Sequence, residues 1–116
     1  MEQQIMTDIT IIQGDIVTAE VDAIVCATSR SLRGNSGVAR AIHHAVGPAI
    51  EAECAEIREQ EGGCPPGSAV ITTAGDLNAD YVIHTVGPVW NRGRSGEPIV
   101  LARCYHACLE LSLIHI

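Results

Sequence analysis

A segment in the first half of the sequence restricts the fold more than any other. Residues 21–27 are almost entirely apolar after an acidic start, and residues 29–37 are mostly small or polar. Residues 38–46 have the composition of a helix, which ends at Gly47-Pro48. A continuous apolar run of this length is typical of a strand that is covered on both faces. The order of strand, glycine-containing loop and helix therefore predicts an α/β fold.

The remaining segments continue this alternation. After Pro48 the apolar residues recur at helical spacing until Gly62-Gly63, where the helix is expected to stop. Further strands are expected at residues 9–15, 69–73 and 81–86, and a further helix after Pro98, with Leu101, Cys104, Cys108 and Leu111 at helical spacing. Such an alternation predicts a three-layer α/β/α sandwich around a largely parallel or mixed sheet, with the ligand crevice at the carboxyl ends of the strands.

The charge of the chain excludes some functions. Seven basic residues stand against 14 acidic ones, which gives a formal net charge of −7. Because nucleic-acid binding depends on clustered Lys and Arg, we do not expect a nucleic-acid partner. The sequence also has no signal-like start and no apolar run of about 18 residues, which a membrane helix requires. We therefore expect a cytoplasmic protein without a membrane partner, and an anionic ligand would be held by backbone dipoles.

The five cysteines do not form a recognisable disulfide or metal-binding pattern. Their number is odd, there is no secretory signal and there is no CxxC pair, so reduced thiols are expected. Cys104 and Cys108 lie four residues apart on a predicted helix, but no second pair of ligands has matching spacing. The sequence therefore predicts neither a metal site nor a cofactor.

The small-residue loop is the first candidate for a ligand site. A loop of this kind that leads into a helix offers free N–H groups and the positive end of the helix dipole, which together can hold a phosphate. The same composition also suits an ordinary tight turn, and neither GxGxxG nor GxxxxGK[ST] is present. Asp15, just past the first predicted strand, could accept a hydrogen bond from an exocyclic amine such as that of adenine, or could be an N-cap or turn residue. The residues alone leave both pairs of alternatives open.

Five blocks of sequence follow one another along almost the whole chain. They are residues 12–17 (IQGDIV) with 21–25 (VDAIV), residues 37–43 (GVARAIH), Gly47-Pro48, residues 62–69 (GGCPPGSA) and residues 80–90 (DYVIHTVGPVW). In this order and spacing they resemble the macro domain family, and specifically its ADP-ribosyl and O-acetyl-ADP-ribose hydrolase branch. The resemblance implies the mixed sheet of a macro domain, incomplete at the C-terminus.

What the resemblance implies about the site is a cleft for ADP-ribose. Asp15 would accept a hydrogen bond from the adenine amine, and the backbone at Ile16 would contact the ring. The residues expected to cradle the diphosphate are Asn35, Ser36, Gly37 and Val38. Ser29 is expected to lie near the distal ribose. The implied partner is therefore free ADP-ribose or an ADP-ribosylated protein.

Three departures from the hydrolase branch concern catalysis. That branch usually has Asn-Ala-Ala-Asn at residues 26–29, a run of glycines at residues 34–37 and a catalytic Asp at Ala39. Ser29 can hydrogen-bond a ribose hydroxyl but cannot replace a carboxylate base, whose loss typically costs about 10²–10⁴ in rate. We therefore assign no catalytic residue, and we interpret Cys26 and His43 as packing or surface groups.

The resemblance also predicts how the chain is organised. Residues 1–110 are expected to be the N-terminal portion of a single macro domain. Residues 111–116 depart from the family and match one reading frame of the transposon mosaic end used in sequencing-library preparation. We therefore interpret these six residues as a non-native, adapter-derived tail.

Three functions remain open on the sequence alone. The first is a binding module for free or protein-linked ADP-ribose. The second is a hydrolase that removes ADP-ribose from proteins or deacetylates O-acetyl-ADP-ribose, with a non-standard residue activating water. The third is an inactive truncated fragment. Binding is favoured over turnover because the usual catalytic positions are occupied by Ser29 and Ala39.

Overall fold

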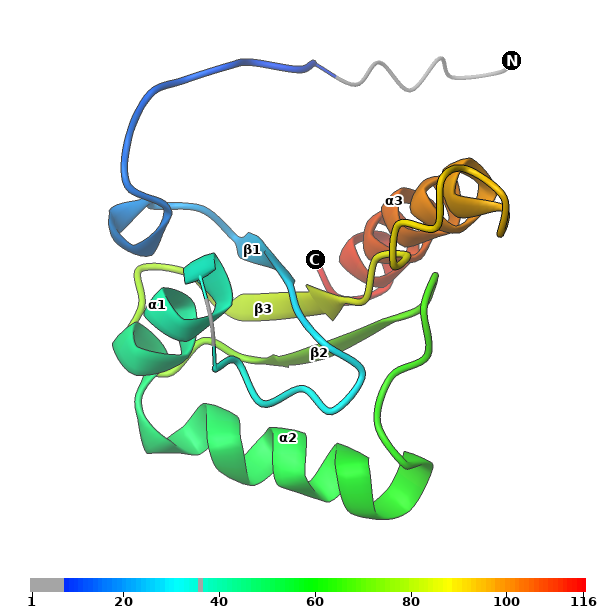
Figure 1. The fold of residues 1–116 in the computed structure, drawn as a ribbon. Coiled ribbons are helices and arrows are strands. Elements are labelled where there is room, and N and C mark those ends of the chain that lie inside the picture. The colour runs from blue at the N-terminus through cyan, green and yellow to red at the C-terminus, as the bar shows by residue number, and fades with distance from the viewer. Residues whose placement is uncertain (1–7, 36) are drawn as a thin grey trace, which may run out of the picture.

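The computed structural model describes residues 8–35 and 37–116 (Figure 1). Its elements, in chain order, are η1 (Ile16–Thr18), β1 (Ala23–Ala27), α1 (Gly37–Val46), α2 (Pro48–Glu61), β2 (Ala69–Thr73), β3 (Tyr81–Thr85) and α3 (Glu97–His115). The strands form one sheet in the order β1-β3-β2, in which β1 is parallel and β2 antiparallel to β3. The predicted α/β fold with a mixed sheet is thus confirmed.

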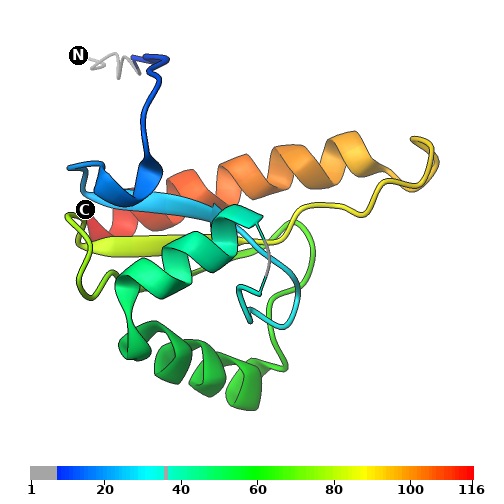
Figure 2. The same cartoon turned by 60° about the vertical axis from the view of Figure 1, so that its left-hand side comes forward.

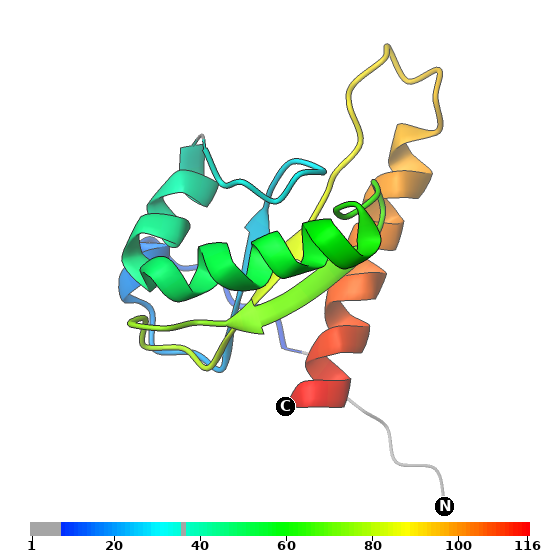
Figure 3. The same cartoon turned by 90° about the horizontal axis from the view of Figure 1, so that it is seen from below.

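The helices lie on both faces of this sheet. On one face α1 contacts β1 and α2 contacts β2, and from the other face α3 contacts β2 and β3. Figures 2 and 3 show the sheet between the α1–α2 pair and α3, so the predicted three-layer sandwich is confirmed. The main core fills the space between the sheet and α1 and α2, where Ile24, Ile42, Ile50 and Val82 are almost completely buried.

The ends of α2 follow from its flanking residues. Pro48 occupies the first turn, where its missing N–H would have had no partner in the helix. Gly62 adopts a left-handed conformation with φ of 76°, and its N–H donates to the carbonyl of Arg58 at 2.9 Å. This is a common way to end a helix, and it confirms the predicted stop at Gly62-Gly63.

The strand predicted at residues 9–15 is wrong. Residues 9–13 have no regular structure, and Ile9, Ile11 and Ile12 are between 79 and 94% exposed. Figure 1 shows this segment leaving the sheet rather than running beside it. Because a strand needs a neighbour that takes up its N–H and C=O groups, an apolar, β-branched composition alone does not produce one.

The last helix is longer than the apolar spacing indicated. α3 starts at Glu97, whose buried carboxylate accepts hydrogen bonds from the N–H groups of Asn91 at 2.9 Å and Gly93 at 2.7 Å. These bonds tie the preceding loop to the first turn of the helix. Within the part of the chain that the structure describes, neither α3 nor any other helix is long and apolar enough to cross a membrane.

Candidate functional site

The loop between β1 and α1 leaves the sheet at the carboxyl ends of two parallel strands. Ala27 and Thr85 are register partners at the ends of β1 and β3, and the N–H of Thr28 donates to the carbonyl of Thr85 at 2.9 Å. Figure 3 shows the loop running from the arrowhead end of β1 to the first turn of α1. The structure therefore places the loop at the edge of the sheet where ligands of α/β proteins usually bind.

The loop is held from the side of α2. The Arg58 guanidinium donates to the carbonyls of Ser31 at 3.0 Å and Leu32 at 3.5 Å, and it also pairs with the Glu51 carboxylate. Leu32 itself is completely buried, and the N–H of Cys64 donates to the carbonyl of Arg30 at 2.9 Å. A loop fixed at several points loses little further freedom when a ligand binds, which favours affinity.

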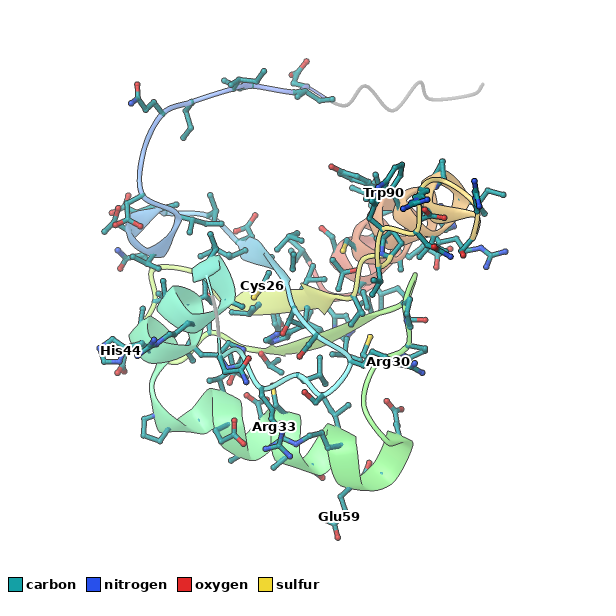
Figure 4. The ribbon with its side chains drawn as sticks, in the orientation of Figure 1. Cys26, Arg30, Arg33, His44, Glu59 and Trp90 are labelled. Carbon is teal, nitrogen blue, oxygen red and sulfur yellow. The ribbon has the colours of Figure 1, made fainter. Side chains whose placement is uncertain are left out.

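Gly34 brings the loop backbone against α1. It is buried, with φ of 58°, and a Cβ atom added there would overlap the imidazole ring of His43. Only glycine therefore allows this close approach. His44, the next residue on α1, is exposed and points away from the sheet in Figure 4. The adjacent histidines thus face different directions.

The predicted diphosphate residues lie on the exposed side of this loop. Asn35, Gly37 and Val38 are all exposed, and Gly37 is the first residue of α1. The first turn of this ten-residue helix carries no acidic residue, so nothing there opposes the positive end of its dipole. The hydroxyl of Ser29 is exposed and lies 3.1 Å from that of Ser31. Ser36 lies outside the described residues.

The predicted adenine residues form a second part of the site. Asp15 caps η1, because its Oδ1 accepts a hydrogen bond from the N–H of Val17 at 3.0 Å. Asp15 and Ile16 line a cavity of about 380 Å³, together with Ile12, Gly14, Thr18 and Ala19. Since η1 contacts α1, the cavity and the loop belong to neighbouring elements. The N-cap alternative for Asp15 is therefore what the structure shows, and its Oδ2 accepts no hydrogen bond from residues 8–35 or 37–116.

Comparison with known proteins identifies the family of this fold. Residues 25–115 match the macro domain family. The chain belongs to that family. It is 54% identical to O-acetyl-ADP-ribose deacetylase 1 of Pantoea vagans over 110 residues, and this alignment covers 95% of this chain and 64% of the relative. It is 53% identical to O-acetyl-ADP-ribose deacetylase of Cronobacter sakazakii, with 89% of this chain and 57% of the relative covered.

Solved macro domains have the same fold. The Oceanobacillus iheyensis macrodomain with ADP matches with a TM-score of 0.81 and 40% identity, over 87% of this chain and 55% of that one. The Trypanosoma brucei macrodomain in complex with ADP matches with a TM-score of 0.74 and 39% identity, over 86% and 39%. This macro domain thus spans between about two fifths and two thirds of the length of these relatives.

The position of the usual catalytic Asp is apolar and covered in this macro domain. Ala39 is buried in the first turn of α1, and that turn carries no carboxylate. Burial raises the pKa of the Cys26 thiol to about 11, with the nearby Cys54 adding to the effect. A thiol with this pKa is protonated at neutral pH and is a weak nucleophile. The geometry therefore supports binding better than covalent chemistry.

Sequence reasoning missed one group of polar residues beneath the loop. Cys26, His43 and His84 each place one donor atom within 4.8 Å of the other two. Burial lowers the pKa of His84 to about 4, and the neighbouring His43 lowers it further. Cys26 and His84 are register partners, which is a non-local property of the sheet. The local signal was weak, because of these three residues only His84 interrupts an apolar strand.

Proposed function

We propose that this macro domain binds ADP-ribose, either free or attached to a protein. The observation that carries the proposal is the pairing of a fixed loop at the N-terminus of α1 with the cavity at Asp15 on the neighbouring η1. The loop would hold the diphosphate through Asn35, Ser36, Gly37 and Val38. The cavity would take the adenine, with Asp15 accepting from its amine and Ile16 beside the ring, and Ser29 would contact the distal ribose.

Two features support this assignment. A helix N-terminus without acidic residues binds anions through its N–H groups, which suits a protein with a net charge of −7. The similar structures from Oceanobacillus iheyensis and Trypanosoma brucei both contain ADP, which shares the adenine and diphosphate of the proposed ligand. The five free cysteines are compatible with the reducing cytoplasm, which we propose as its location.

Isothermal titration of ADP-ribose tests the proposal. It should be run on this chain, and on this chain extended with the C-terminal remainder of the Pantoea vagans relative. We expect saturable binding that Asp15→Ala weakens about 10- to 100-fold, the usual value of a hydrogen bond to a charged group. Asp15→Asn retains the cap of η1, so it separates loss of the carboxylate from loss of the turn. Asp80→Asn, just before the start of β3 and outside the lining of the cavity at Asp15, is the control.

A folded sample that does not bind in either form would refute the proposal. Equal binding by the wild type and by Asp15→Ala would refute only the assignment of adenine to the cavity at η1. These outcomes are distinct because the diphosphate and the adenine are assigned to different elements.

Hydrolysis is a second candidate function, favoured by 54% identity to a protein named O-acetyl-ADP-ribose deacetylase. Ala39 is the third residue of α1, so Ala39→Asp would restore a carboxylate in the first helical turn. If the remaining site is competent, we expect acetate release from O-acetyl-ADP-ribose to rise by about 10²-fold or more. Ala41→Asp, on an exposed position of the same helix, is the matched control. A wild type already as fast as the relative would mean that another residue activates water.

A further inference from the structure

Three side chains with metal-binding atoms converge beneath the loop, from three different elements. Cys26 comes from β1, His84 from β3 and His43 from α1. Cys26 and His84 are register partners in a parallel pair, so their side chains share one face of the sheet. That face is the one that α1 covers, and Figure 4 shows Cys26 between β1 and α1. The sulfur and one nitrogen of each ring all lie within 4.8 Å of one another.

Two of these atoms lack the partner that a buried polar atom normally has. His84 is completely buried, and its Nδ1 has no hydrogen-bond partner in the described part of the chain. The same is true of Nε2 of His43, an atom that is inaccessible to solvent although the residue as a whole is half-buried. Among the residues that the structure describes, the Cys26 sulfur has one hydrogen-bond contact, a distant one with the carbonyl of Ala27 at 3.9 Å. Native proteins rarely leave such nitrogens unpaired, which points to a ligand for them.

The hydrogen bonds around His84 favour one of its two neutral tautomers. The Thr72 hydroxyl donates to the carbonyl of Thr73 at 3.2 Å, so it has no second proton to offer. It therefore accepts from Nε2–H of His84, which lies 2.9 Å away. A neutral ring with its proton on Nε2 has a free lone pair on Nδ1, the atom without a partner. A hydroxyl that orients a histidine in this way is typical of the groups that support metal ligands.

The two imidazoles of the cluster need no deprotonation to bind a metal ion, whereas the Cys26 thiol, whose pKa burial raises to about 11, must lose its proton. Burial lowers the pKa of His84 to about 4 and also lowers the pKa of His43, so both rings are neutral at pH 7. The other groups that face the cluster are Cys54, Glu51 and Arg58 of α2. Glu51 raises the pKa of His43 and so opposes the effect of burial, whereas Arg58 lowers it and adds to that effect. Neutral imidazoles and one sulfur are the donors that Zn²⁺ prefers.

We propose that Cys26 Sγ, His43 Nε2 and His84 Nδ1 form a binding site for one transition-metal ion of borderline or soft character, with Zn²⁺ as the reference ion. Tetrahedral coordination at the usual Zn–S and Zn–N lengths places donor atoms about 3.3–3.6 Å apart. Because the donors here lie within 4.8 Å of one another, binding would draw them together by at most about 1.5 Å. Binding forms a bond between the metal and Cys26 Sγ and releases the thiol proton to solvent. The inference does not depend on the proposed ADP-ribose site.

Titration of the metal-free protein with Co²⁺ tests this site, because Co²⁺ reports its ligands in its absorption spectrum. We expect one ion per chain, a near-ultraviolet band from thiolate to cobalt, and visible bands of tetrahedral intensity, all displaced by Zn²⁺. About one proton should be released for each ion bound at neutral pH. Cys26→Ser and His84→Gln should each weaken Zn²⁺ binding by about 100-fold or more.

Two control variants separate this site from others on the chain. Cys108→Ser removes a buried thiol on the opposite side of the sheet, and His106→Ala removes the exposed ring that pairs with Glu110 at 2.8 Å. Both should bind as the wild type does. Unchanged affinity in Cys26→Ser, or loss of binding in His106→Ala, would overturn the proposal.

Circular dichroism establishes whether each variant folds. If Cys26→Ser does not fold, alkylation of the wild-type protein with and without Zn²⁺ answers the same question. The modified cysteine is identified by mass spectrometry. We expect Zn²⁺ to protect Cys26 more strongly than Cys108, and equal protection of the two thiols would overturn the proposal.

Discussion

The two faces of the sheet are covered to different extents. On the α1–α2 face the strands present Ile24, Cys26, Val82 and His84, all of which are 2% exposed or less. On the α3 face Val25 remains 49% exposed, and a groove of about 460 Å³ separates β1 from the helix. We call the α1–α2 face the closed face and the α3 face the open face. The closed face positions the loop of the candidate site. The site therefore rests on the better-packed half of the molecule, where Arg58 of α2 holds the middle of the loop and α1 follows its end.

The largest expected difference between the faces is in stability. Ile42 of α1 is completely buried, whereas Ile99 of α3 is 61% exposed. We expect Ile42→Ala to lower the free energy of unfolding by about 2–5 kcal/mol and Ile99→Ala by less than about 0.5 kcal/mol. Both changes replace isoleucine by alanine within a helix, so helix propensity largely cancels. Urea unfolding followed by circular dichroism measures both, and similar losses would mean that the faces are equally packed.

The second prediction concerns acid sensitivity of the closed face. Because the pKa of His84 is lowered to about 4 in the folded protein, the unfolded chain takes up its proton first as the pH falls. The contribution of His84 is complete above about pH 6.5 and is lost progressively between there and about pH 4, with a total near 3 kcal/mol. We expect wild-type stability to fall more steeply in this range than that of His84→Gln.

The measurement for His84 is urea unfolding between pH 4 and 7, with a chelator present to exclude bound metal. Carboxylates titrate in the same range, so the informative quantity is the difference between the wild type and His84→Gln at each pH. His44→Gln, which removes an exposed imidazole, is the matched control. Parallel curves for the wild type and His84→Gln would contradict the prediction.

Features of the fold that depend on local interactions were predictable from the sequence. The ends of α2 were predictable because Pro48 and Gly62 act locally, through a missing N–H and a left-handed φ. The loop and α1 were predictable for the same reason, since Gly34 and Gly37 indicate a turn and an apolar spacing indicates a helix. The position of the loop at the carboxyl end of β1 followed from the alternation of elements.

Features that depend on pairing between distant residues could not be predicted in this way. The strand expected at residues 9–15 is absent because composition does not supply a neighbouring strand to pair with it. The meeting of Cys26 with His84 depends on the register of β1 against β3, which no local pattern fixes. Asp15 shows an intermediate case, because its capping role was foreseeable as an alternative but the cavity beside it was not.

A third prediction tests how closely the loop depends on the closed face. Gly34 and Gly37 have the same φ of 58°, but only at Gly34 would a Cβ atom meet a neighbour, the ring of His43. We expect Gly37→Ala to cost about 1–2 kcal/mol through backbone strain alone. Gly34→Ala should cost about 1 kcal/mol more, because the loop must move away from α1.

Thermal unfolding measures the stability of the two variants, and titration of ADP-ribose measures their binding. If the loop binds the diphosphate, Gly34→Ala should weaken binding even at temperatures where the protein stays folded. Equal stability of the two variants would show that the loop does not rest on His43.

The smallest effect on stability is expected on the open face. Leu109 of α3 is 60% exposed and lines the groove beside β1. Because the side chain is already largely in water, Leu109→Lys should change the free energy of unfolding by no more than about 0.5 kcal/mol. It should nevertheless reduce self-association, since a charge interrupts an apolar surface that is otherwise exposed. Light scattering as a function of concentration measures this, with Ala102→Lys, which adds the same charge at an exposed position of α3 outside the groove, as the control. Equal reductions in the two variants would mean that the added lysine itself, rather than its position in the uncovered groove, governs association.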